Sequence, residues 1–299
     1  MTALQDTTVQ APPRTASERL ARIVGRSPVH IILGLIALIW LVPSIGLLIT
    51  SFRPGADMRA SGWWNVLFEP RFTLANYERV ITDQGMGQAF LNSFFITVPS
   101  TILPLVIASM AAFALAWVKF PLRDTTFLVI VGMLIVPVQI GFIPLVVAMR
   151  ESGLPLLTTY GGLWLAHTAF ALPFGIFLLR NFFITLPKDL IEAARIDGAS
   201  NIGIFRTIVV PLSVPAIAAY GIFQFLWVWN DLLMALVFLA GQPDKAPMTV
   251  RIPYLLSTYG QEYNLLSAAA FLLMIVPLIV FFSLQRYFVQ GLLAGSVKS

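Results

Sequence analysis

The 299-residue chain has no cysteine, two histidines and four lysines. Without cysteine there are no disulfides, thiolate nucleophiles or thiolate-bound metals, and no histidine pair has the spacing of a zinc site. An ATPase phosphate loop ends in Gly-Lys followed by Ser or Thr, but no lysine here follows a glycine. We therefore expect no catalytic residue, no metal site and no bound cofactor on this chain.

Charge is also scarce. Charged residues make up 11% of the chain and hydrophobic residues 58%, whereas soluble domains carry about 25% charged residues. This composition indicates a membrane protein. The net charge of +5 is spread along the chain, so we expect it to set membrane topology rather than to bind nucleic acid.

Long apolar runs divide the chain. The run 31–50 has 20 residues, enough to cross a hydrocarbon core of about 30 Å as a helix. Five more candidate spans follow, at 90–117, 126–148, 161–183, 214–240 and 264–288. We therefore expect an all-α membrane protein with six transmembrane helices within residues 28–290. Polar tails are expected at 1–27 and 291–299.

The basic residues orient this six-helix arrangement. With both termini in the cytoplasm, twelve of the 19 Lys and Arg residues lie inside and seven outside, as the positive-inside rule requires. The segment 187–215 is then cytoplasmic and the segment 52–88 is external. Trp63, Trp64 and Tyr77 in the external segment fit an interfacial aromatic belt or a folded cap that meets a soluble partner.

The segment 187–215 is a polar island in this apolar chain. Three basic and three acidic residues lie between Lys188 and Arg206. Their charges cancel, whereas a loop that only sets topology would be mostly basic. The island therefore favours docking onto another protein, with an ordinary solvated loop as the alternative.

Local residue chemistry predicts two short helices in the island. Pro187 and Asp189 favour a helix start, and Gly198 favours its end. Ser200 or Asn201 can cap the second helix, and the prolines 211 and 215 then turn the chain back towards the membrane.

Inside the first short helix, Glu192 and Arg195 are three residues apart and are expected to pair. Ala193 and Ala194 are small enough to let a partner surface approach the backbone.

The island also carries a recognisable pattern. Glu192-Ala193-Ala194, Asp197-Gly198-Ala199, Ile208 and Pro211 resemble the EAA motif of ABC importer permeases, with Val210 where Leu is common. The resemblance extends from residue 51 to residue 298 and is to the carbohydrate-uptake, MalG-like branch. It includes Phe72–Tyr77, Asn92-Ser93, Ile143–Leu145, Trp229-Asn230 and Gly291–Lys298.

The resemblance implies the fold of an ABC type I importer permease in the bacterial inner membrane. Its coupling helix would sit in a groove of a separate ATPase, through Glu192, Ala193, Ala194, Arg195, Asp197 and Gly198. The implied partners are a second, MalF-like permease, a dimer of ATP-binding subunits that binds ATP and Mg, and an extracytoplasmic sugar-binding protein. Maltose or trehalose would be typical substrates of the branch.

A polar stripe in the fifth run suggests a substrate path. Tyr220, Gln224, Trp227 and Asp231 are spaced i, i+4, i+7 and i+11, along one face of a helix, and Asn230 adjoins them. Amides and carboxylates bind sugar hydroxyls, and aromatic rings cover C–H faces. The alternatives are interfacial anchoring of the tryptophan and pairing of Asp231 with another helix.

Other readings remain open at this point. A self-sufficient secondary carrier or channel would have an inverted repeat and several intramembrane charges, whereas Asp231 is nearly alone within a span. A membrane scaffold that transports nothing is a third possibility. His167 and Gln139 are weaker pore candidates, for which buried, hydrogen-bonded structural roles are expected.

Overall fold

The computed structural model describes residues 16–83, 85–259 and 262–296, and the side chains of 28–83, 85–255 and 262–285. Over these residues the protein is built from helices and contains no strand. The N-terminal tail was expected to extend to residue 27, but residues 16–27 are helical and run straight into the first span. The C-terminal tail was expected from residue 291, but residues 291–296 belong to the last helix. Residues 1–15 and 297–299 of the two expected tails lie outside the described residues.

Within the described residues, four helices are long and apolar enough to cross a membrane. They coincide with the predicted runs 31–50, 90–117, 161–183 and 264–288. These helices are α1 (Ala16–Phe52), α4 (Met86–Trp117), α7 (Tyr160–Phe183) and α14 (Tyr263–Ser296).

The third predicted span is not one straight helix. Residues 126–148 fall on α5 (Arg123–Met133), the 3-10 turn η2 (Val138–Gly141) and α6 (Phe142–Glu151). The two halves are bent by 100°. Pro137 stands at the break, where its missing N–H and fixed φ interrupt the helical ladder.

The fifth predicted span is also interrupted. The helix α11 ends at Trp229 (Val214–Trp229), and the short α12 (Leu233–Phe238) follows after a three-residue break. The segment 201–212 before α11 is bent from it by 79°. Six spans therefore result only if each bent pair crosses once.

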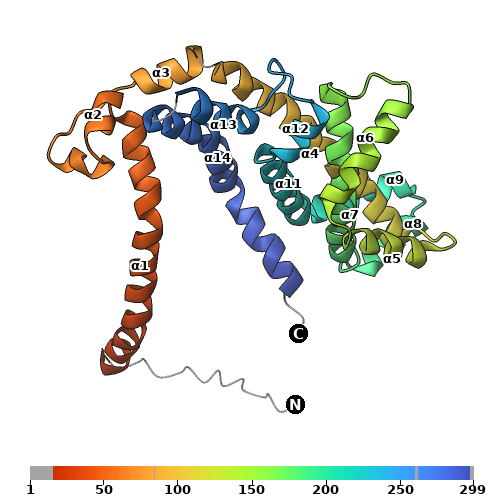
Figure 1. Ribbon diagram of the computed structural model, residues 1–299. Coiled ribbons are helices and arrows are strands. Elements are labelled where there is room, and N and C mark those ends of the chain that lie inside the picture. Colours follow the sequence, from red (N-terminus) through yellow and green to blue (C-terminus); the bar gives the residue numbers. More distant parts are fainter. Residues whose placement is uncertain (1–15, 84, 260–261, 297–299) are drawn as a thin grey trace.

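The densest packing lies where α4, α7 and α11 meet, on the right in Figure 1. Ala108 and Ala112 of α4 lie with Leu179 of α7 and Tyr220 of α11 in one buried cluster. Alanines bring the helix backbones close together, as small residues do between membrane helices. This cluster connects the spans to the polar island, because Ile191 belongs to it as well.

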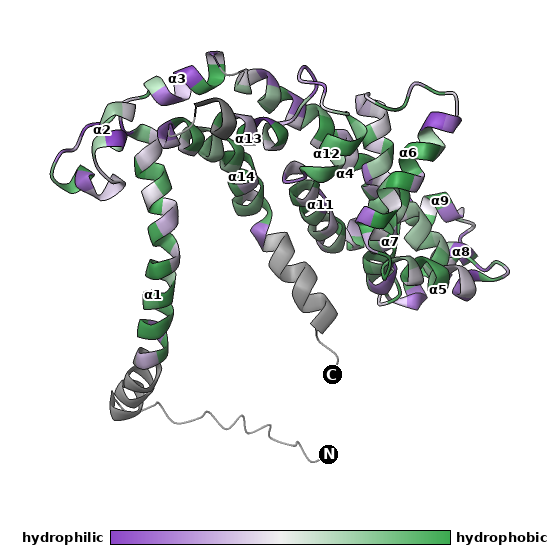
Figure 2. Cartoon of the chain, viewed as in Figure 1, coloured by the Kyte–Doolittle hydropathy of each residue, from purple (hydrophilic) through white to green (hydrophobic). Residues whose placement is uncertain are grey.

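The helix α1 stands apart from this body (Figure 1). It contacts α14, and in the view the two helices meet at their upper ends and diverge below. Only 6% of its apolar segment is buried within the chain, and most of the residues along its described part have the hydrophobic colouring in Figure 2.

The expected external segment is folded. It contains α2 (Gly55–Ala60), η1 (Trp63–Leu67) and α3 (Ala75–Thr82). Buried Asn76 donates to the carbonyls of Ser51 and Arg53 at 2.9 and 2.8 Å and accepts from Asn264 at 2.8 Å. One amide thus fixes α3 to the C-terminal end of α1 and the start of α14.

A second buried amide, that of Asn92, lies near the start of α4. Asn92 donates to the carbonyls of Asp244 and Ala246 at 2.8 and 3.1 Å, and its oxygen accepts from Tyr160 and Gln88 at 2.8 and 2.9 Å. These bonds hold the connection between α12 and α13 (Met248–Tyr259) against α4 and α7. The sequence did not predict α13.

Candidate functional site

The polar island begins with α8 (Lys188–Ile196). The helix starts directly after Pro187 and ends where Gly198 adopts a left-handed φ of 81°. There the amide of Gly198 donates to Arg195 O at 3.1 Å and the amide of Ala199 to Ala194 O at 2.9 Å. Such bonds satisfy carbonyls left open at a helix end, so the predicted start and stop are confirmed.

The second short helix also forms, and Ser200 is its cap. The Ser200 hydroxyl oxygen accepts from the Gly203 amide at 3.1 Å at the start of α9 (Asn201–Ile204). A π-helical turn, η3 (Phe205–Val209), and α10 (Val210–Leu212) complete the segment.

The two faces of α8 differ in a way that suits docking. Ile191 is wholly buried and Ala194 packs against the same core cluster. On the outside Glu192 and Ala193 are exposed, and Ile196 is 86% exposed. With Ile202, 66% exposed, the island presents uncovered apolar side chains, which mark an interaction surface when they lie together.

Arg195 does not form the expected pair with Glu192. Among the described side chains no ion pair joins these two residues; Arg195 instead donates from Nη2 to Trp117 O at 2.6 Å. The partner is the last residue of α4 and lies 78 positions earlier in the sequence. Asp197 and Glu192 are exposed to solvent.

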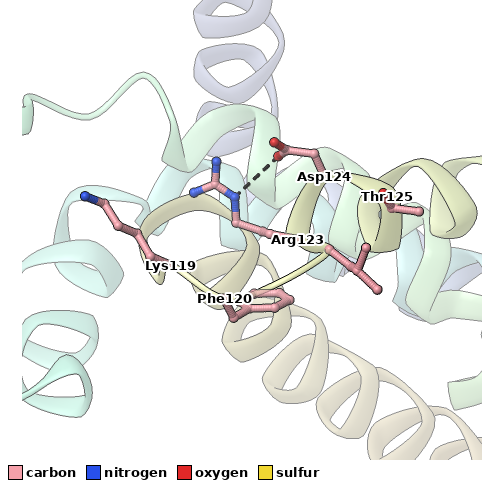
Figure 3. A pocket seen from close by; sticks show the side chains of 6 residues that line it. Lys119, Phe120, Arg123, Asp124 and Thr125 are labelled. Carbon is pink, nitrogen blue, oxygen red and sulfur yellow. Dashed lines mark hydrogen bonds and ion pairs between the residues drawn. The ribbon is translucent and has the colours of Figure 1, made fainter.

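The turn after Trp117 and the start of α5 line an open hollow of about 480 Å³, shown in Figure 3. Arg123 Nε lies 3.3 Å from Asp124 Oδ1 at its edge. Arg180 of α7 reaches the same carboxylate at 3.7 Å, and its guanidinium carbon lies 3.8 Å from the ring centroid of Phe127. The ends of α4, α5 and α7 therefore meet next to the residue that binds Arg195.

The predicted stripe on α11 divides into two parts. Tyr220 is buried and donates to Ala171 O of α7 at 3.1 Å. Gln224 is also buried and donates to Ser100 O of α4 at 3.0 Å. These two side chains fasten α11 to its neighbours within the chain.

The other stripe residues lie at the end of α11. Trp227 is 38% exposed, and Asn230 is exposed with its amide donating to Leu226 O at 2.8 Å. The side chain of Asp231 is 14% exposed and accepts from the amides of Met234 and Ala235 at 3.3 and 3.1 Å. Asp231 thus stabilises the first turn of α12.

The two weaker pore candidates lie in different surroundings. Gln139 is exposed in η2, at the break of the third predicted span. His167 is fully buried, and its Nε2 lies 3.9 Å from Asp231 Oδ2. Neither ring nitrogen has a hydrogen-bond partner within the described part of the chain, so the expected hydrogen-bonded role of His167 is not seen there.

The sequence analysis assigned no individual role to three residues that hold helix ends or connections, although Asn92 is part of the family pattern. Trp117 and Arg180 hold the ends of α4 and α7, and Asn92 holds the connection before α13. An aromatic residue at the end of an apolar run, two positions before Lys119, was the available signal for Trp117. Among the described side chains, no group of three or more His, Asp and Glu residues converges as a metal site.

Long apolar helices joined to a polar loop with exposed apolar side chains are typical of an integral membrane component of a larger assembly. The chain belongs to the family of binding-protein-dependent transport system inner membrane components, which matches residues 105–293. It is thus the permease subunit of an ABC importer, a transport component whose ATPase is a separate subunit. This membership decides against the self-sufficient carrier and the scaffold.

Curated relatives cover most of the chain. It is 54% identical over 276 residues to the osmoprotective compounds uptake permease protein GgtD of Synechocystis, covering 91% of this chain and 92% of the relative. It is 49% identical over 257 residues to the alpha-glucoside transport system permease protein AglG of Rhizobium meliloti, covering 83% and 68%.

The fold has solved counterparts. A subunit of a bacterial ABC transporter involved in the import of the acidic polysaccharide alginate matches with a TM-score of 0.73 and 25% identity. The match covers 93% of this chain and 100% of that one. The predicted ABC importer permease fold is thereby confirmed.

Proposed function

We propose that this chain forms half of the translocation path of an importer for small neutral glycosides, such as an α-glucoside or a related osmoprotective solute. The observation that carries the substrate class is the 54% identity to GgtD over 91% of the chain, together with the 49% identity to AglG. A maltose-like or trehalose-like sugar belongs to the same chemical class.

The ATPase would dock on the outer face of α8. Ala193 leaves the helix backbone open to close approach, and Ile196 and Ile202 supply the apolar contact. Glu192 supplies a polar contact on the same exposed side, while Gly198 and Asp197 shape the turn that orients it. ATP and Mg would be bound by that partner alone.

A second, MalF-like permease would complete the membrane domain. The exposed apolar surface of α1 supports this, since Ile39 and Trp40 are 69% and 78% exposed. The bent pairs also leave α11 open on the side that carries Phe223 and Trp227, 46% and 38% exposed.

The substrate path would run along that open side of α11. Phe223, Trp227 and Asn230 are spaced i, i+4 and i+7, so they share one helix face. Aromatic rings can cover the apolar face of a sugar while the amide of Asn230 binds a hydroxyl. Tyr220 and Gln224 would then act by holding α11 in place.

The position of α8 supports the proposed orientation of the chain in the membrane. The folded segment 53–82 precedes α4, whereas Arg195 of α8 binds the last residue of α4, so the two lie at opposite ends of that helix. The basic bias favours a cytoplasmic location for α8 and both termini in a bacterium, in which case the folded segment would face the sugar-binding protein.

Uptake by membrane vesicles tests this function. The chain would be expressed with its second permease, ATP-binding subunits and binding protein, and the vesicles offered labelled α-glucosides, oligosaccharides and amino acids. We expect α-glucoside uptake that requires ATP and the binding protein. Uptake without ATP would refute the importer mechanism, and uptake of amino acids alone would refute the substrate class.

A cross-link tests the docking face separately. The chain contains no cysteine, so Ala193→Cys introduces a single thiol on exposed α8. It should cross-link to the ATP-binding subunit, whereas Ser61→Cys in the expected external segment should not. The reverse pattern would refute the proposed sidedness.

A further inference from the structure

Arg195 belongs to the motif expected to contact the ATPase, yet its guanidinium is turned towards its own chain. Nη2 donates to the carbonyl of Trp117 at 2.6 Å. Charge-assisted hydrogen bonds of this length are among the stronger ones in proteins. Trp117 is the last residue of α4, and carbonyls at a helix end have no partner within the helix.

A second hydrogen bond continues from the same residue. The indole Nε1 of Trp117 donates to the carbonyl of Phe183 at 3.1 Å. Phe183 is the last residue of α7. Arg195 therefore binds the end of α4, and the final residue of α4 binds the end of α7.

A parallel contact ties α7 back to α4. Arg180 Nε in the last turn of α7 donates to Leu115 O at 3.3 Å. A cation near a helix C-terminus is also favoured by the helix dipole. The ends of α4 and α7 are thus bound to each other, and Arg195 binds α8 to the end of α4.

The helices α4, α7 and α8 are closely packed against one another. Ile191 of α8 is wholly buried in the same cluster as Leu115 and Phe183, and Trp117 and Ala194 pack against it. Packed interiors transmit displacement rather than absorb it. A shift of α8 must therefore move the ends of α4 and α7.

We propose that Arg195 is a positioning residue that connects α8 to α4 and α7 through the carbonyl and the indole of Trp117, and that it is not a contact to the ATPase. The proposal rests on the importer function above. In it, motion of α8 driven by the ATPase reaches the membrane helices through the connection Arg195–Trp117–Phe183. The exposed face around Glu192 and Ala193 remains the docking surface.

The test uses the full complex with its binding protein in proteoliposomes. Arg195→Ala removes the guanidinium, and Trp117→Phe keeps an aromatic ring but removes the indole donor. In both variants we expect substrate imported per ATP to fall at least about fivefold, the lower range of an allosteric coupling. ATP hydrolysis stimulated by the binding protein should persist.

Three further variants separate loss of coupling between hydrolysis and uptake from loss of general stability. Arg195→Lys retains a cationic donor and should restore part of the coupling. The double variant Arg195→Ala with Trp117→Phe should be no worse than Arg195→Ala alone, since residues acting in one connection are not additive. Arg206→Ala is the matched control: it removes an exposed arginine of the same loop and should leave coupling unchanged.

One pattern of results would overturn the proposal. The single variant Arg195→Ala would lose the ATP-binding subunits, or would lose hydrolysis and uptake equally, while the single variant Trp117→Phe behaved like the wild type. Arg195 would then be a contact to the ATPase, while the importer function stands. If Arg195→Ala fails to insert, Trp117→Phe decides, and normal coupling in it refutes the connection. Failure of the importer function itself would show differently, as uptake by the wild-type complex without ATP.

Discussion

His167 Nε2 and Asp231 Oδ2 lie 3.9 Å apart, and they join the middle of α7 to the break after α11. The ring of His167 also meets the ring of Trp227 edge-on, with centroids 5.9 Å apart. The pair lines a cavity of about 10 Å³ together with Ser93 and Thr97 among others, with space for one water molecule at most. The exposed ring of Trp227 in the proposed path is thus in contact with His167, which in turn lies beside Asp231.

Asp231 should contribute to stability more than to substrate binding. Its carboxylate accepts from the amides of Met234 and Ala235 in the first turn of α12. Asp231→Ala removes these acceptors and should cost about 1 kcal/mol of stability, as loss of a helix cap does. Asp231→Asn keeps one acceptor and should cost less. Thermal unfolding of the purified complex measures both, alongside the apparent KM for uptake.

The two readings of Asp231 separate in that experiment. An unchanged KM with a lowered melting temperature supports the structural role. A raised KM at unchanged stability would place Asp231 in direct contact with the substrate.

Asn92 should be one of the most sensitive positions outside the coupling loop. It is 1% exposed and makes four hydrogen bonds. Asn92→Ala would leave two backbone carbonyls and two side-chain donors to find other partners, at a cost of about 3 kcal/mol. Tyr160→Phe removes one of the four bonds and should cost about 1 kcal/mol. Thermal unfolding of both variants gives the comparison; equal effects would contradict the role of Asn92 as the centre of the network.

Gly198→Pro should uncouple hydrolysis from uptake without preventing membrane insertion. The backbone φ at this residue is +81°, whereas proline requires a φ of about −65°. Proline also lacks the N–H that donates a hydrogen bond to Arg195 O. We expect substrate imported per ATP to fall at least about fivefold. Uptake and hydrolysis measured in the same proteoliposomes give this ratio.

The control for Gly198 is the same substitution at Gly153. That glycine has a similar φ of +70° but lies in the connection between α6 and α7. Gly153→Pro should leave the ratio of uptake to hydrolysis unchanged. If both variants lost the coupling of hydrolysis to uptake, the effect would be due to general instability rather than to the polar island.

Trp227 should affect the apparent affinity for substrate. Trp227→Ala removes an exposed ring from the face that also carries Phe223 and Asn230. The apparent KM should rise about threefold to tenfold, the value of one aromatic contact, with little change in stability. Trp227→Phe keeps a ring and should stay close to wild type. An unchanged KM in Trp227→Ala would assign this face to lipid or to the second permease.

Local structure could be predicted from the sequence wherever it depends on residues close together in the chain. Gly198 ends α8 and Ser200 caps α9 because their partners lie within four residues along the chain. The same holds for the four continuous spans, since 20 or more apolar residues cross a bilayer whatever surrounds them. The break at Pro137 was harder to place, because transmembrane helices tolerate proline where neighbouring groups satisfy the freed carbonyls. The break after Trp229 contains no proline, so no such residue marked it in the sequence.

The sequence by itself determined the class of protein, the apolar spans and the two short helices of the polar island. Only the tertiary structure decided which polar side chains face inward. Tyr220 and Gln224 share a helical stripe with Trp227, but contacts from α7 and α4 bury the first two and leave Trp227 exposed. Arg195 likewise has an obvious partner three residues away, yet it binds Trp117. Periodicity gives the direction of a side chain around its own helix, whereas its partner depends on which helix packs there.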